Sequence, residues 1–213
     1  MAARAAFGAV TAFLVATIAL NLGFATREPW HMSEFANTPA WWLWQSALYA
    51  FAAGGLPLTW AAAPILPRHR LSAVGLALLG LAGLGALLVA TFPVDPTPQP
   101  VSLAGHIHND AAWPTFLLLG AAMLVWATAF AASPLWESLA PATLWMGRAV
   151  LALGLLYVWF DAQRSPTVGP VQRVLVAVAA VWLLLLSLRL LELSGLAFRS
   201  RSHRARRRTA QRT

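Results

Sequence analysis

Acid and imidazole side chains are concentrated between residues 92 and 112, in the sequence FPVDPTPQPVSLAGHIHNDAA. Asp95 lies among four prolines, and His106, His108 and Asp110 follow. Imidazole and carboxylate are ordinary zinc ligands, so Asp95, His106 and His108 could bind a divalent metal such as zinc. The alternative is that His108 and Asp110 cap a helix, because no HExxH-type pattern accompanies the histidines.

The prolines of this stretch forbid a continuous helix, and they shape what we expect of the histidines. His106 and His108 are two positions apart, a spacing that suits an extended segment rather than one face of a helix. We therefore expect the next helix to begin near residue 111, with Asp110 as its N-cap and Pro114 in its first turn. Asp95 is either a ligand or base, or the residue that closes an Asx turn ahead of the next proline.

A second polar stretch, TREPWHMSEFANTPA, precedes residue 41. Ser33 could act as a nucleophile with the His31 imidazole as its base, assisted by Glu34. A serine before an acidic residue is also the usual N-cap of a short interfacial helix. Thr38 and Pro39 resemble the N-cap and first position of the helix that follows.

Gln172 and Arg173 form a third polar position, late in the chain. Arginine is suited to bidentate contact, so this pair could bind a lipid phosphate or a carboxylate of the site. The simpler interpretation is an ion pair of Arg173 with Asp161 or Asp95.

The composition shows what kind of protein must position these groups. The chain has 213 residues, of which 59% are hydrophobic and 10% charged, so it is too apolar to cover a soluble surface. It has no cysteine, which excludes thiol chemistry and disulfides. Apolar runs long enough to cross a bilayer predict an all-α, polytopic bundle of six transmembrane helices, at Ala5–Ala25, Trp41–Ile65, Leu71–Phe92, Ala111–Ala132, Thr143–Ala162 and Val171–Leu193. The third run is rich in glycine, and we expect it at the centre of the bundle.

Arginine placement predicts the orientation. Seven of the 15 basic residues lie after residue 198, and loops that retain arginine are cytoplasmic. We expect a cell-membrane protein with both termini cytoplasmic, divided into a six-span domain (1–195) and a basic, disordered tail (196–213) that lies on anionic lipid. Membrane lipids, and as a second option another membrane protein, are the expected partners, and nucleic acid is excluded by the spans.

Four segments in order carry a resemblance: HMSEFAN, FPVDP, GHIHNDAA, and GPVQR followed by an apolar run. From about Ala5 to Leu193 the chain resembles the bacterial and archaeal membrane family catalogued as domain of unknown function 998. The resemblance implies a membrane fold in which six positions matter: Ser33, Glu34, Asp95, His108, Gln172 and Arg173. It implies less constraint at His106, and it supplies no activity.

Two functions remain from the sequence. The first is a membrane-embedded hydrolase of a lipid or lipid-linked substrate at the outer leaflet, using Asp95 and His108 with Ser33 or Glu34. The second is a non-catalytic accessory subunit, lipid-binding scaffold or small permease. In either case we expect Asp95, His108, Ser33, Glu34 and Arg173 to lie close together on the outer face, because unpaired charges at the hydrocarbon boundary are costly.

Overall fold

The computed structural model describes residues 1–23, 31–67, 69–96 and 101–210, with side chains described as far as residue 195. Its long helices are α1 (Ala2–Gly23), α2 (Trp41–Ala62), α3 (Arg70–Thr91), α4 (Leu103–Ala131), α5 (Ala140–Ala162) and α6 (Val168–Ala210). Two short 3-10 helices, η1 (Met32–Asn37) and η2 (Glu137–Leu139), lie in connections. Apart from these helices, the described residues form turns and irregular segments, so the predicted all-α class is confirmed.

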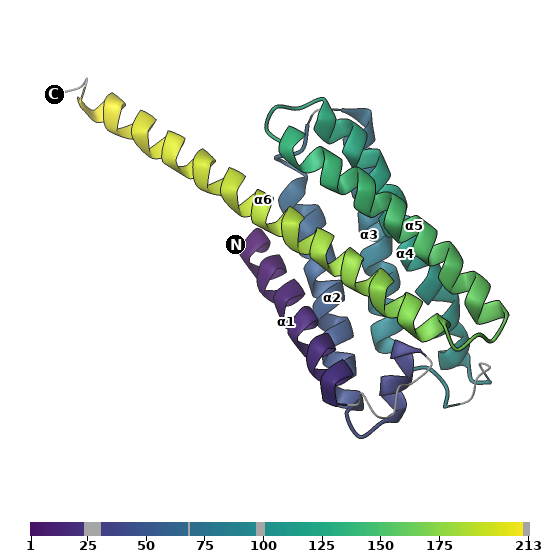
Figure 1. Cartoon of the computed structure of the whole chain (residues 1–213). Coiled ribbons are helices and arrows are strands. Elements are labelled where there is room, and N and C mark those ends of the chain that lie inside the picture. The colour runs from purple at the N-terminus through teal and green to yellow at the C-terminus, as the bar shows by residue number, and fades with distance from the viewer. Residues whose placement is uncertain (24–30, 68, 97–100, 211–213) are drawn as a thin grey trace.

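The six long helices form a ring. Each packs mainly against its neighbours in sequence, and α6 packs against α1, which closes the ring. Figure 1 shows that η1, the connection before α4 and the α5–α6 connection lie at one end, which we call the cavity end. The start of α1 and the α2–α3 and α4–α5 connections lie at the opposite end, which we call the closed end.

Five of the six helices are long and apolar enough to cross a membrane, namely all except α2. Four tryptophans, a glutamine, a proline and two glycines lower the hydropathy of α2. The chain is thus an all-α polytopic membrane protein, as the sequence predicts.

The prediction that the glycine-rich third span is central is wrong. Helix α3 packs against α2 on one side and α4 on the other, and it leaves Val74, Leu81 and Leu84 about half exposed. Its glycines serve close approach to these two neighbours: a Cβ at Gly75 would lie 2.3 Å from the Trp126 ring, and one at Gly83 would lie 2.9 Å from Leu56. Small residues therefore mark tight contacts here, not the centre of the bundle.

Aromatic rings fill the closed end. Trp126 packs against Phe130, with ring centroids 5.7 Å apart, and Phe130 stacks on Trp136 at 4.6 Å. Trp182 of α6 joins them, 6.0 Å from Trp126. Because these rings are buried and in contact, this end has a solid core.

Several helix boundaries differ from those expected. Helix α4 begins at Leu103, eight residues early, with Ser102 rather than Asp110 as its N-cap; Pro114 therefore lies inside the helix. Helix α2 begins at Trp41, and Thr38 accepts the Ala40 N–H from outside it. The backbone of α6 continues beyond the expected end, to Ala210. Disorder of the isolated tail stays a prediction.

Candidate functional site

A cavity of about 760 Å³ opens at the cavity end. All six long helices and η1 contribute to its wall, which is why residues distant in sequence meet there. Its polar lining includes His31, Ser33, Glu34, Asp95, His108, Asn109, Tyr157, Asp161, Arg164 and Gln172. Its apolar lining includes Phe13, Leu48, Phe51, Ala86, Phe116 and Val176.

The two kinds of lining lie at different depths. Apart from Thr115, whose hydroxyl donates to the Ala111 carbonyl of its own helix, the polar groups come from η1, the connections and the nearby helix ends, so they form the mouth. Phe13 lies ten residues before the end of α1, and Phe51 lies ten residues after the start of α2. At a rise of 1.5 Å per residue, the apolar floor reaches about 15 Å into the bundle. The cavity is therefore polar at its mouth and apolar at its floor.

Asp95 accepts hydrogen bonds from residues at the start of α4. One of its carboxylate oxygens accepts the backbone N–H groups of Val101 at 2.8 Å and Ser102 at 3.0 Å, and the other accepts the Ser102 hydroxyl at 2.8 Å. Ser102 in turn accepts the N–H of Gly105, at 3.0 Å. Gly105 leaves room for this arrangement, because a Cβ there would lie 2.1 Å from the Asp95 carboxylate. These contacts reach residues six and seven positions further on, whereas the Asx turn considered from the sequence bonds the backbone two positions on, so Asp95 stabilises the start of α4 instead.

These contacts also change the acidity of Asp95. The hydrogen bonds from the Ser102 and Val101 backbone N–H groups lower the pKa of its carboxyl below the ordinary value, and the Ser102 hydroxyl lowers it further. The carboxylate is thus ionised and engaged by its own turn, which makes it a poor general base.

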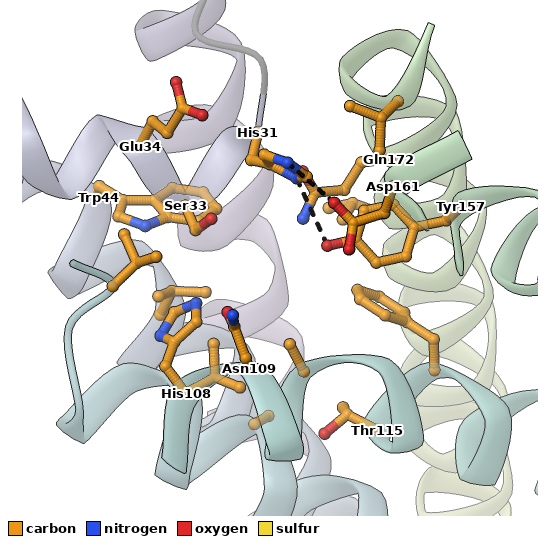
Figure 2. A pocket seen from close by; sticks show the side chains of 18 of the residues that line it. His31, Ser33, Glu34, Trp44, His108, Asn109, Thr115, Tyr157, Asp161 and Gln172 are labelled. Atoms are coloured by element: carbon orange, nitrogen blue, oxygen red, sulfur yellow. Dashed lines mark hydrogen bonds and ion pairs between the residues drawn. The ribbon is translucent and has the colours of Figure 1, made fainter. Parts of the chain in front are cut away.

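His108 links α3 to α4. The helix is already formed at this position, so His108 is buried while His106, two positions earlier, is exposed. The Nδ1–H of His108 donates to the Phe92 carbonyl at 2.7 Å, because a carbonyl oxygen can only accept. The ring thereby satisfies a carbonyl at the end of α3, and Figure 2 shows its other nitrogen turned toward the cavity.

The predicted metal set of His106, His108 and Asp95 is not assembled. The expectation of an extended segment is wrong, because a helix turns residues two positions apart to different sides. Among the described residues, no three His, Cys, Asp or Glu side chains are grouped so that they could hold a metal ion.

A second imidazole crosses the mouth. His31, in the extended residue before η1, pairs through Nε2 with the Asp161 carboxylate at 3.3 Å. Its Nδ1 lies 3.5 Å from the Tyr157 hydroxyl, and Figure 2 shows the three side chains together. Both partners come from the end of α5, so this contact joins η1 to α5.

Gln172 anchors η1 to α6. Its Oε1 accepts the Met32 backbone N–H at 2.7 Å, and both residues are buried. Gln172 therefore positions the η1 segment over the mouth.

The predicted cluster is assembled only in part. Ser33, Glu34, Asp95, His108 and Gln172 all line the cavity. Arg173 is not part of the lining, and its guanidinium Nε–H donates to Asn21 Oδ1 of α1 at 2.7 Å. Successive residues of a helix point in different directions, so Gln172 faces the cavity while Arg173 faces α1.

Trp44 and Tyr157 are cavity residues that sequence reasoning missed. Trp44 is 4% exposed and lines the wall beside Ser33 (Figure 2). Tyr157 precedes Asp161 by four positions, a helical spacing that places both on one face of α5 and is visible in the sequence.

Comparison with known proteins supports the sequence resemblance. Residues 5–189 match the family described as "Protein of unknown function (DUF998)". No curated protein and no solved structure gives a significant match to the chain.

Proposed function

This chain belongs to the DUF998 family, whose function is unknown, and we propose from its cavity that it binds one molecule of a single-chain amphiphile. The observation that carries this proposal is the division of one cavity into a polar mouth and an apolar floor. A lipid headgroup at the mouth would meet hydrogen-bonding groups, and its hydrocarbon chain would meet aromatic and aliphatic side chains. The cavity volume lies within the range of about 300–1,000 Å³ usual for small-molecule sites.

We further propose the orientation of this site in the cell membrane. Helix α2 crosses the bilayer as the sixth span, since it packs between α1 and α3 and its 22 residues reach about 33 Å. The arginine distribution supports both termini in the cytoplasm, with the tail on anionic lipid and the cavity opening toward the outer leaflet. Cysteine labelling in intact cells tests this: Ser202→Cys is protected from an impermeant reagent, and labelling from outside contradicts the orientation.

Filling the cavity tests the binding proposal. Ala112 lines the wall, so Ala112→Phe places a ring inside the cavity. We expect this variant to lose a single-chain lipid, such as monooleoylglycerol, that the purified wild type retains. Ala53→Phe is the matched control, because Ala53 is exposed on α2 and outside the cavity lining. Native mass spectrometry reads the bound lipid directly, and equal retention by both variants would contradict the proposal.

A membrane-embedded hydrolase is the second candidate, and the His31–Asp161 pair favours it. A carboxylate that orients an imidazole beside a lipid cavity is an arrangement used in general acid–base catalysis. Ser33 lines the same cavity, but in the described residues no hydrogen bond joins its hydroxyl to a histidine. This differs from the sequence hypothesis, which relied on Asp95 and His108.

Release of fatty acid separates the two candidates. If the protein is a hydrolase, it converts monooleoylglycerol to oleate, and His31→Gln stops the release while the lipid still binds. If it is a binding protein, the wild type retains the lipid intact over the same time.

A further inference from the structure

Four tryptophans are almost fully buried in the described part of the chain, and their indole N–H groups differ in hydrogen bonding. Trp126 donates to the Ser72 carbonyl at 3.1 Å, Trp136 to the Ile65 carbonyl at 3.2 Å, and Trp182 to the Thr143 hydroxyl at 3.2 Å. Trp44 is also buried, yet its Nε1–H has no hydrogen-bond partner. Buried donors are nearly always paired, so an unpaired one in a cavity wall calls for a functional explanation.

The position of Trp44 indicates what would pair with it. Toward the mouth its neighbour is Ser33, and one and two turns further along α2 the wall becomes Leu48 and Phe51. Trp44 thus lies at the level where the polar lining gives way to the apolar lining. In an amphiphile bound with its head at the mouth and its chain at the floor, that level corresponds to the junction between headgroup and chain.

We infer that the ligand is an acyl lipid whose ester or amide carbonyl accepts the Trp44 Nε1–H, an inference that rests on the proposed binding function. In acyl lipids the carbonyl lies at the junction of head and chain, which matches the level of Trp44. A carbonyl is also an acceptor without a competing donor, which suits an indole that can only donate.

Pairing also requires a small rearrangement. The Trp44 nitrogen is shielded by its neighbours as well as unpaired. A ligand carbonyl reaches it when the indole or an adjacent side chain turns, and the hydrogen bond gained offsets the cost of that turn. A buried donor without an acceptor costs free energy. A ligand with an acceptor at this level therefore binds more tightly than one without it.

The charges at the mouth indicate the kind of headgroup. The described lining carries the carboxylates of Asp95 and Asp161 against the guanidinium of Arg164. A phosphate would meet this excess of negative charge, whereas hydroxyl groups can hydrogen-bond to carboxylates and to the Asn109 amide. The inferred ligand is therefore an acyl lipid with an uncharged, hydroxyl-bearing head.

A matched pair of lipids tests the inference. The full-length protein is mixed with equal amounts of 1-monooleoylglycerol and its 1-O-oleyl ether, which lacks only the carbonyl, and bound species are counted by native mass spectrometry. We expect the wild type to favour the ester about five-fold, as one net hydrogen bond allows. Trp44→Phe should bring the ratio close to one, while Trp182→Phe, the control at the closed end, should leave it unchanged.

The outcomes separate this inference from the proposed function. If the wild type binds neither lipid, the proposed function fails and the inference falls with it. If it binds both equally, or if Trp44→Phe keeps the five-fold preference, the protein binds amphiphiles but the carbonyl contact is wrong. A third ligand, 1-oleoyl lysophosphatidic acid, tests the headgroup: we expect it to bind at least about ten-fold more weakly than the monoacylglycerol, and equal or tighter binding overturns the uncharged head.

Discussion

The two ends of the bundle use the same residue types for opposite purposes. At the closed end Trp126, Trp136 and Trp182 fill the space between helices, and each indole donates a hydrogen bond. At the cavity end Trp44 is as deeply placed, but it borders a hollow of about 760 Å³ and its donor is unpaired. The packed tryptophans of the closed end stabilise the fold. The cavity end is less stabilised, but it leaves a space that a ligand can occupy.

Histidine and carboxylate side chains show the same difference within the cavity end. Asp95 and His108 are engaged by backbone groups of the turn and helix end that they stabilise. His31 and Asp161 are joined to each other across the mouth, and Figure 2 shows them facing the cavity. Residues bound to backbone define the shape of the site, and residues bound to other side chains can exchange partners for a ligand.

The largest expected effect is at the closed end. Trp126→Ala removes the ring that contacts both Phe130 and Trp182, and we expect it to lower the free energy of unfolding by about 3 kcal/mol or more. Denaturant titration in detergent measures this. Trp60→Ala is the control, because Trp60 is 82% exposed, and its effect should be within about 0.5 kcal/mol. A small effect at Trp126 would show that the closed end is not the stabilising core.

An intermediate effect distinguishes the two kinds of tryptophan in delipidated protein. Trp182→Phe leaves the buried Thr143 hydroxyl without its donor, so we expect a loss of about 1 kcal/mol. Trp44→Phe removes a donor that is already unpaired, so stability should stay the same or rise. Thermal unfolding of both variants decides the point, and equal losses would remove the distinction between the ends.

An effect of similar size concerns the start of α4, where Asp95 is held. Ser102→Ala removes the N-cap of α4 and should cost about 1 kcal/mol of unfolding free energy. Because the folded pKa of Asp95 is lowered, its carboxylate adds stability that is present above the ordinary value of 3.8 and is lost as pH falls through the folded value.

Comparing unfolding at about pH 6 and about pH 3 measures that pH dependence. Ser102→Ala lacks one of the groups that lower the Asp95 pKa, so it should lose less stability on acidification than the wild type. A wild type whose stability is the same at both values would show that the turn contributes little.

Local pattern was enough to predict the class and most of the helices. Long apolar runs and a low charge content admit only a helical membrane protein, because backbone groups in lipid must pair within their own segment. The same reasoning predicted that polar residues from distant segments share one end, and Ser33, Glu34, Asp95 and His108 do line one cavity, whereas Arg173 contacts α1. The predicted start of α4 was wrong, because the helix begins eight residues earlier, directly after its N-cap Ser102. The backbone N–H of Ser102 donates to Asp95, seven positions before it.

The sequence by itself determined that Asp95 and His108 would lie near one end of the bundle, since prolines end the preceding helix and polar groups avoid hydrocarbon. Only the tertiary structure decided their partners. Whether a side chain is a ligand, a cap or a cavity wall depends on which atoms lie within about 3 Å of it, and helices distant in sequence supply those atoms. For this reason the His31–Asp161 contact and the unpaired indole of Trp44 become visible only when the ring of six helices closes.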